Sequence, residues 1–235
     1  MTASLQSPST HVDALRDSST PFRLFERLIF SYHAVYTLNM LELERLDEAL
    51  ALLGALLEER GEEVGLLVIG GTSLLMLGLV ERPTADVDIV GLAGDGSTYL
   101  QAHELPGFLA TAAAEVGAAL ALPRDWLNVG PAGLITFGLP AGLAQRVTIR
   151  RYGGLEVHLP SVDDLICFKL YAVVDLTENS RHFQDLQAIG PTAEQLLTAA
   201  RWTRTHDPSP GFLGELIRIL RLFDVEVNDD DLAIP

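Results

Sequence analysis

Hydrophobic and polar residues follow two different periods along this chain, which predicts a mixture of helices and strands. Apolar side chains recur at helical spacing in residues 22–32 and again in residues 43–57. We interpret these runs as two helices, or as one helix that is broken near residues 37–40. Residues 1–20 are rich in Ser, Thr and Pro and contain few large apolar groups, so we expect them to be disordered.

Beyond residue 63 the apolar runs become short, and turn-forming residues separate them. Runs of this length are expected to form strands. Longer runs with apolar residues at helical spacing lie between and after them. We therefore predict an α+β fold, in which residues 21–160 form a mixed β-sheet flanked by helices and residues 161–235 form a C-terminal helical lobe. The predicted strands are residues 66–69, 85–90, 134–139, 146–152 and 155–161.

A glycine turn follows the first of these strands directly, and the rest of the chain is expected to be organised around it. The turn consists of Gly70 and Gly71, and either Thr72 or Ser73 can cap the short helix that follows. Paired glycines leave room for a phosphate to approach the backbone, and a helix start offers free N–H groups. The turn is therefore a candidate phosphate-binding site.

Two carboxylates follow on the next predicted strand. Asp86 and Asp88 lie two positions apart, so they project from the same face of the strand. Side by side they repel each other unless a cation lies between them, and Mg²⁺ is held by one or two carboxylates with water and substrate phosphates. Mn²⁺ is the alternative ion. A glycine pair before a helix is common, and D-x-D occurs by chance in acidic proteins, but together they fit one ligand, a metal-bound nucleoside triphosphate (NTP).

Composition and charge narrow the possible functions. The 235 residues include 32 acidic and 16 basic side chains, and the formal net charge of −16 repels nucleic acids unless a local basic patch binds them. No apolar run approaches the roughly 20 residues that span a membrane, so we expect a cytoplasmic protein with no membrane partner. The single cysteine, Cys167, excludes an internal disulfide and lies in an apolar run typical of a core.

One basic residue differs from all the others. Lys169 is the single lysine, and the remaining 15 of the 16 basic residues are arginines. It lies in an apolar run of a predicted helix that Ser161 can cap. A lysine in this setting either extends to the surface or points at an anion, and its compact charge can follow a triphosphate.

Residues 66–90 resemble the signature of the nucleotidyltransferase superfamily with its polymerase-beta-like fold, and they resemble most closely its AbiEii-like toxin branch. Further similarity lies in DWLN at residues 125–128, in the strand and helix of residues 155–175, and in RHFQDLQAI at residues 181–189. The resemblance covers about residues 64–189. It implies a nucleotidyltransferase fold, an NTP substrate and a Mg²⁺ cofactor.

The resemblance also implies roles for single residues. A third metal-binding carboxylate in this superfamily often comes from a strand beside the aspartate strand, and Glu156 matches it, although a Glu on an edge strand is more often simply solvated. Asp185 matches the last aspartate of the family, whereas His182 stands where another aspartate is frequent. Arg82 can bind the departing pyrophosphate or form a salt bridge to the aspartate pair. The implied residues are Asp86, Asp88, Lys169 and Asp185 for catalysis, Gly70, Gly71, Thr72, Ser73 and Arg82 for nucleotide binding, and Asp86, Asp88 and Glu156 for the metal.

The expected activity is Mg²⁺-dependent transfer of a nucleoside monophosphate (NMP) from an NTP to an acceptor hydroxyl. The resemblance suggests the 3′ end of a tRNA or another RNA as the acceptor, and a toxin that a cognate antitoxin restrains. The acidic composition suits a small-molecule or protein acceptor better. A catalytically silent module that only binds nucleotides is a third hypothesis, because a fold can be kept after its activity is lost.

Overall fold

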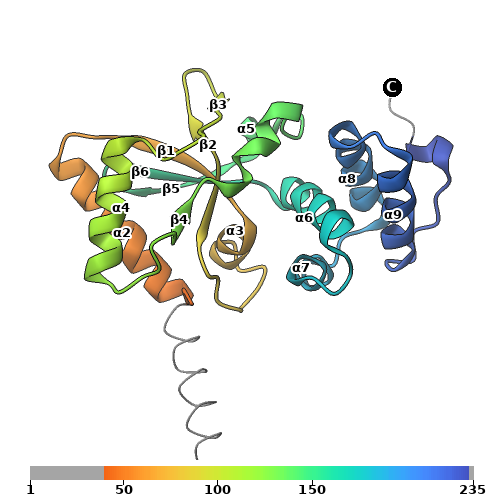
Figure 1. Cartoon of the computed structure of the whole chain (residues 1–235), viewed down its shortest axis with the longest axis horizontal. Coiled ribbons are helices and arrows are strands. Elements are labelled where there is room, and N and C mark those ends of the chain that lie inside the picture. Colours follow the sequence, from red (N-terminus) through yellow and green to blue (C-terminus); the bar gives the residue numbers. More distant parts are fainter. Residues whose placement is uncertain (1–39, 233–235) are drawn as a thin grey trace, which may run out of the picture. The chain divides into compact units, whose positions relative to one another are not determined.

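The computed structural model describes residues 40–232, whose arrangement is shown in Figure 1. The predicted disordered segment at residues 1–20 and the predicted helix at residues 22–32 lie outside this part of the chain. No helix within it combines the length and the hydrophobicity needed to cross a membrane. The helices are α2 (Leu43–Glu59), α3 (Gly70–Met76), α4 (Gly107–Ala119), α5 (Leu143–Arg146), α6 (Val162–Leu176), α7 (Arg181–Ile189), α8 (Ala193–His206) and α9 (Pro210–Arg221), with the 3₁₀ helices η1 (Gly130–Phe137) and η2 (Asp229–Leu232). The strands are β1 (Val64–Ile69), β2 (Val87–Ala93), β3 (Tyr99–Leu100), β4 (Leu127–Asn128), β5 (Thr148–Tyr152) and β6 (Leu155–Leu159).

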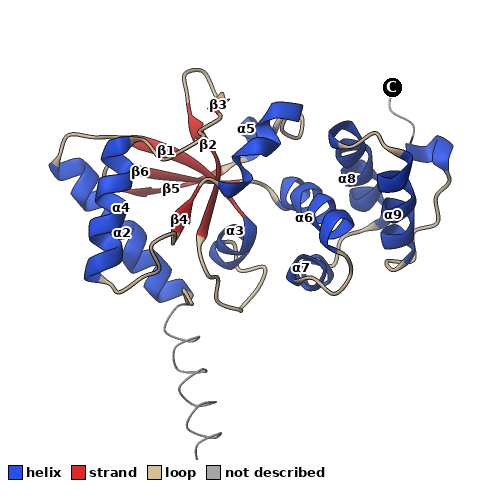
Figure 2. Ribbon diagram, in the orientation of Figure 1, coloured by secondary structure: helices blue, strands red, loops and turns tan. Residues whose placement is uncertain are grey.

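The described strands form a mixed sheet in the order β3-β2-β1-β6-β5, with β4 also beside β2 (Figure 2). Strand β1 is parallel to β6 and antiparallel to β2, and β5 is antiparallel to β6. Because β1 is central, its side chains are buried on both faces: Leu66 and Val68 pack on one side, Leu67 and Ile69 on the other. This mixed sheet with flanking helices confirms the predicted fold class.

A β-bulge interrupts the pairing of β1 with β2. Val90 is an extra residue on β2, and the register shifts where Leu67 gives way to Val68 on β1. The shift brings Ile69, the last residue of β1, opposite Asp88. The glycine turn therefore begins beside one of the two predicted metal ligands.

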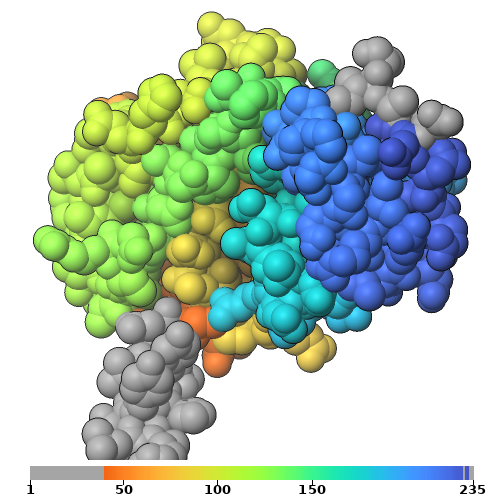
Figure 3. Space-filling view, turned by 45° about the vertical axis from the view of Figure 1, so that its right-hand side comes forward, coloured from red at the N-terminus to blue at the C-terminus, as the bar shows by residue number. Residues whose placement is uncertain are grey.

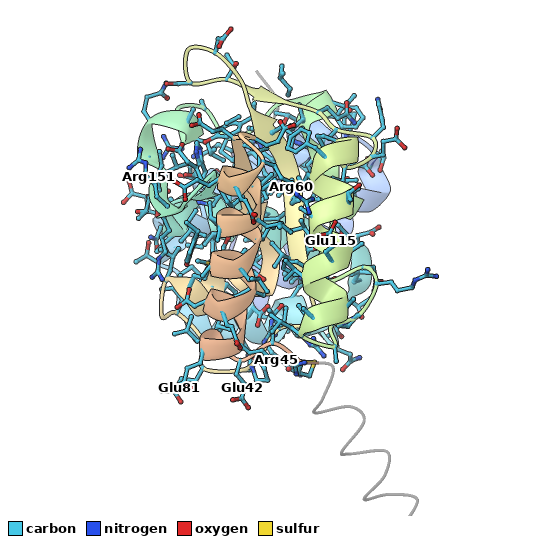
Figure 4. The ribbon with its side chains drawn as sticks, turned by 90° about the vertical axis from the view of Figure 1, so that its left-hand side faces the viewer. Glu42, Arg45, Arg60, Glu81, Glu115 and Arg151 are labelled. Atoms are coloured by element: carbon cyan, nitrogen blue, oxygen red, sulfur yellow. The ribbon has the colours of Figure 1, made fainter. Side chains whose placement is uncertain are left out.

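Helices α2 and α4 lie side by side over one face of the sheet (Figure 4). Arg60, just after α2, forms an ion pair of 2.6 Å with Glu115 on α4, and the two side chains point toward each other in Figure 4. Both are partly exposed, so the pair contributes little stability. The predicted helical spacing of residues 43–57 is confirmed by four leucines of α2 that are fully buried, Leu46, Leu50, Leu53 and Leu57.

The opposite face of the sheet is covered by α3, α5 and α6. Val87 and Ile89 point toward α2 and α4, so Asp86 and Asp88, which alternate with them, face the α3 and α6 side. Helix α6 also packs with α7, α8 and α9 around a second apolar cluster, and Cys167 lies there with 5% exposure, as predicted. A domain boundary near residue 160 stays a prediction.

The prediction of a strand at residues 134–139 is wrong, because the chain forms the 3₁₀ helix η1 there. Pro131 near its start has no N–H to donate to a sheet. The helix packs instead over β2 at Gly91, where an added Cβ would lie only 2.6 Å from Ile135 Cδ1. The missing side chain of Gly91 thus makes room for η1 on the sheet.

The predicted start of the helix after the glycine turn is also wrong. Helix α3 begins at Gly70, its N-cap residue is Ile69, and no side chain caps it. Thr72 and Ser73 therefore lie inside the first turn and not before it. The hydroxyl groups of these two residues are bonded elsewhere, which bears on the site described below.

Candidate active site

Asp86 and Asp88 lie side by side at the start of β2 and share one amide partner. Asn128 on β4 is opposite Asp88 in the sheet register. Its Nδ2 donates to Asp86 Oδ2 at 3.2 Å and to Asp88 Oδ1 at 3.4 Å. The short strand β4 thus supplies a neutral hydrogen-bond donor that bridges the two carboxylates.

Burial and a neighbouring negative charge raise the pKa of each carboxyl group. Burial, followed by the charge of Asp86, raises the pKa of Asp88 to about 6. Burial, followed by the charge of Asp125, raises the pKa of Asp86. The amide hydrogen bonds act in the opposite direction, as do the more distant charges of Lys169 on Asp88 and Arg181 on Asp86. The site therefore holds two poorly solvated carboxylates, an arrangement that a divalent cation stabilises.

The glycine turn lies directly against this pair. Gly70 has a φ of +75°, and a Cβ added to it would lie 2.5 Å from Asp88 Oδ2. Only glycine fits so close to the carboxylate in this backbone conformation. Gly71 is restricted by close packing alone, because an added Cβ would lie 2.7 Å from Thr84 Oγ1. The turn and the carboxylate pair thus occupy the same corner of the structure.

Thr72 and Ser73, which we expected to cradle phosphates, are turned inward. Both side chains are 0% exposed. Thr72 Oγ1 donates to the backbone oxygen of Asp86, and Ser73 Oγ donates to that of Val68, each at 2.6 Å. In this arrangement the two hydroxyl groups fix α3 to the flanking strands and are not directed at a ligand.

Lys169 on α6 and Asp185 on α7 form a buried ion pair at the wall of the same site. Lys169 Nζ donates to Asp185 Oδ2 at 2.6 Å, and the two side chains are only 4% and 2% exposed. Arg82, from the loop after α3, donates from Nε and Nη2 to the two oxygens of the same carboxylate at 2.8 and 2.6 Å. Figure 3 shows the cyan surface of α6 and α7 adjoining the gold surface around α3. Arg82 therefore pairs with Asp185 and not with the aspartate pair.

Burial and neighbouring charges set the protonation of this cluster. Burial lowers the pKa of Lys169, although Asp185 and Asp88 oppose the change. Burial alone would raise the pKa of Asp185, but the hydrogen bonds from Arg82 and the charge of Lys169 outweigh it and lower that pKa. His182 Nδ1 lies 3.4 Å from Lys169 Nζ, and burial, followed by this ammonium, lowers the pKa of His182. A charged carboxylate thus holds the ammonium beside a neutral imidazole.

Glu156, the expected third metal ligand, does not lie beside the aspartate pair. Its strand β6 neighbours β1 and not β2, and Glu156 is opposite Gly65, whereas Asp88 is opposite the far end of β1. Four residues along a strand correspond to about 13 Å. The carboxylate of Glu156 is bound instead by Arg151 at 2.7 Å and by His158 at 3.2 Å. Within residues 40–232 no group of three or more His, Cys, Asp or Glu side chains is arranged to hold a metal ion.

A pocket of about 690 Å³ opens beside these groups, a volume typical of small-molecule sites. Gly70, Asp88 and Lys169 line it directly. Asp185 and Arg82 are not part of the lining and contact it through Lys169. The structure therefore brings together the glycine turn, one carboxylate of the pair and the single lysine at one opening.

The sequence carries little signal for two features of this site. Asn128 lies in DWLN, which the family resemblance includes without giving this residue a role. Trp126 anchors the segment, because its Nε1 donates to the backbone oxygen of Ala113 at 3.0 Å. The other feature is the aromatic part of the pocket, where Phe137 and Tyr171 come from different elements. Nothing in the local pattern of either residue indicates that they share a cavity.

Comparison with protein families gives this site a chemical class. Residues 42–179 match the family described as "Nucleotidyltransferase of unknown function (DUF6036)". The match covers more than half of the chain, includes Asp86, Asp88 and Lys169, and ends before Asp185. No curated protein and no solved structure matches the chain. The chain therefore belongs to this family of nucleotidyltransferases.

Proposed function

We propose that this protein is a Mg²⁺-dependent nucleotidyltransferase that moves an NMP from an NTP to an acceptor hydroxyl. The observation that carries the proposal is the contact of Gly70 with Asp88, in a pocket that Lys169 also lines. A glycine turn admits a phosphate chain, a carboxylate pair admits a divalent cation, and an ammonium neutralises a leaving phosphate. Each feature alone has a simpler structural explanation, but together they supply what phosphoryl transfer requires.

The chemistry of the carboxylate pair suits Mg²⁺. Asp86 and Asp88 form a hard oxygen donor set with raised pKa values, and an amide is their hydrogen-bond partner. Mg²⁺ completes its coordination with water and substrate phosphates, so a third protein carboxylate such as Glu156 is not required. Mn²⁺ accepts the same oxygen ligands. The bound ion would polarise the α-phosphate and neutralise the charge that develops on it.

The residues of the chain have separate roles in this transfer. Gly70 lines the pocket beside Asp88, where the triphosphate would lie, and the Lys169 ammonium stabilises the negative charge of the leaving pyrophosphate. Asp185 and Arg82 hold that ammonium in place as positioning residues. The acceptor oxygen bonds to the α-phosphorus, and the bond from that phosphorus to the bridging oxygen breaks. Pyrophosphate leaves with the electron pair, and the hydroxyl proton passes to water.

We propose an RNA as the acceptor, in particular the 3′ end of a tRNA, and a role as a toxin that a cognate antitoxin restrains. The order of the motifs supports this, because it resembles the AbiEii-like branch of the superfamily. Arg181 supports it as well: this side chain at the start of α7 is exposed and close enough to Asp86 to lower its pKa. It therefore offers a cation for an RNA phosphate next to the reacting groups.

A small-molecule or protein acceptor is the second candidate, and the charge distribution favours it. The net charge of −16 repels a polyanion. Several arginines are bound within the structure: Arg146 pairs with Asp164, Arg151 pairs with Glu156, and Arg204 donates to backbone oxygens of residues 207–209. Binding of a nucleic acid backbone by these side chains would compete with the contacts that they already make.

Labelled NTPs test the proposal directly. Each of the four NTPs, labelled at the α-phosphate, is incubated with the full chain, Mg²⁺ and total RNA, and the same NTP labelled at the γ-phosphate serves as the control. The α-label should enter RNA and the γ-label should not, because it leaves in pyrophosphate. Asp86→Ala should abolish the transfer, and Asp95→Asn, an exposed carboxylate in the β2–β3 turn, should not change it.

Each other outcome has a definite meaning. Equal labelling by the wild type and by Asp86→Ala would show that the mechanism is wrong. Label that enters a small-molecule or protein fraction in place of RNA would identify the second candidate. NTP binding without any transfer, with all acceptors supplied, would identify the catalytically silent nucleotide-binding module.

A further inference from the structure

We infer that the aromatic side of the pocket binds the nucleobase of the NTP, an inference that rests on the proposed function. Helix α6 lines the pocket with two adjacent stripes at helical spacing. Lys169 and Ala172 belong to one stripe, which faces the carboxylate pair and α7. Phe168 and Tyr171 belong to the other, whose rings contact Trp202 and His206 of α8. One pocket therefore offers a charged side and an aromatic side to the same ligand.

Three elements contribute to this aromatic wall, which we define as Phe137 of η1, Tyr171 of α6 and His206 of α8. The ring of His206 lies 5.7 Å from that of Phe137 and 5.4 Å from that of Tyr171. Trp202 supports the wall, with its ring 4.1 Å from that of His206. Its Nε1 also donates to the backbone oxygen of Gly138 at 3.2 Å, which ties α8 to the end of η1. The wall is thus assembled before a ligand arrives.

The exposure of Phe137 points to a stacking partner. This ring is 61% exposed, although it lines a pocket that contains other aromatic groups. A flat, uncharged ring that covers it would remove apolar surface from water. Stacking of a base on an aromatic side chain changes affinity by roughly 5- to 150-fold. Every nucleobase has such a face, and purines have the larger one, so we expect all four NTPs to bind and purine NTPs to bind more tightly.

Contacts with neighbouring residues hold His206 in place at the same wall. Its side chain is 6% exposed, and its Nδ1 lies 3.2 Å from Thr205 Oγ1, whereas its Nε2 is buried without a hydrogen-bond partner among the described residues. The Trp202 and Leu134 carbonyls both act on this ring, so His206 is a fixed part of the wall and not by itself a ligand site. Burial lowers the pKa of His206, against the effect of the Trp202 and Leu134 carbonyls, which keeps the ring neutral at pH 7.

The charged side of the pocket selects which aromatic ligand can occupy the wall. Asp88 favours a ligand that brings a cation, and the Lys169 ammonium, although paired with Asp185, attracts a ligand that brings negative charge. A peptide side chain or a lipid tail would satisfy the aromatic wall alone. An NTP with its metal ion satisfies both sides, because its base and its phosphates are joined through a ribose.

A comparison of whole nucleotides with bare phosphates tests the inference. The full chain is titrated calorimetrically, with Mg²⁺ present, with non-hydrolysable analogues of the four NTPs and with inorganic tripolyphosphate. The wild type should bind the analogues more tightly than tripolyphosphate. Phe137→Ala should weaken analogue binding roughly tenfold and leave tripolyphosphate binding unchanged. Leu100→Ala is the matched control, because Leu100 is a large apolar residue of 60% exposure outside this pocket.

The outcomes separate this inference from the proposed function. Unchanged analogue binding by Phe137→Ala, or equal binding of analogues and tripolyphosphate by the wild type, would overturn the base site and leave the transferase proposal intact. Weaker binding of a short RNA by Phe137→Ala with unchanged analogue binding would assign the wall to the acceptor, which also overturns the inference. Absence of all triphosphate binding would overturn both proposals.

Discussion

Replacement of Gly70 by alanine tests whether the glycine turn and Asp88 form one site. The new Cβ would lie 2.5 Å from Asp88 Oδ2, so the carboxylate must move by about 1 Å to reach an ordinary contact distance. The φ of +75° adds a backbone cost of roughly 1–2 kcal/mol for any L-residue. We expect the free energy of unfolding to fall by about this amount, and metal affinity to fall roughly 10- to 100-fold, as when groups that orient a metal ligand are disturbed.

Binding of Mn²⁺ with a non-hydrolysable NTP analogue, followed by electron paramagnetic resonance, measures the site without knowledge of the acceptor. Urea unfolding measures the backbone cost. Gly78→Ala is the matched control, because Gly78 has a φ of +70° and nothing within 4 Å of an added Cβ. It should lose similar stability and no metal affinity. The reasoning is refuted if Gly70→Ala binds Mn²⁺ as the wild type does, or if both variants lose affinity equally.

The remaining predictions concern buried charges near the pocket. Asp185→Ala should lower the free energy of unfolding by about 3–5 kcal/mol, because it leaves the buried Lys169 unpaired. Lys169→Met should lower the free energy of unfolding much less, since Arg82 still pairs with the carboxylate of Asp185. Equal losses for the two variants in urea unfolding would contradict this reasoning. Asn128→Asp should be less stable than the wild type in a chelator, and added Mg²⁺ should stabilise it more than it stabilises the wild type. Thermal melting with and without Mg²⁺ measures both effects. A gain no larger than that of the wild type would count against a metal site at Asp86 and Asp88. The lowered pKa of His206 means that its imidazole binds a proton less readily in the folded chain than in the unfolded chain. The contribution of His206 to the free energy of unfolding is therefore complete above its ordinary pKa of 6.5 and is lost as the pH falls below it. His206→Phe should therefore gain stability relative to the wild type as the pH falls from about 7 to 5, and a pH-independent difference in urea would exclude this cause.

Local patterns in the sequence predict the parts of the site that lie on neighbouring residues. A strand of period two places Asp86 and Asp88 on one face, whatever the rest of the fold is, and their shared amide partner is consistent with this. The apolar spacing of α2 likewise determines its buried face. These predictions hold because the geometry of one element determines them.

Predictions that depend on pairing between distant segments are less secure. The alternation of β6 gives Glu156 the correct face of the sheet, but it cannot give the strand order, which places β6 beside β1 and at the wrong register for the metal site. Arg82 and Asp185 are another example, because their contact joins the loop after α3 to a helix near the other end of the chain. No local period carries information about such a pair.

The bulge at Val90 has a consequence for how the chain avoids misfolding. If β1 and β2 paired in a straight ladder, each residue of β2 before the bulge would rotate to the other side, and Asp88 would enter the apolar layer under α2 and α4. An ionised carboxylate costs several kcal/mol there, so the competing alignment is unfavourable from the outset. The two aspartates of the candidate site therefore also disfavour the shifted pairing of β1 with β2. A variant that lacks both of them would be free to shift this register by one residue.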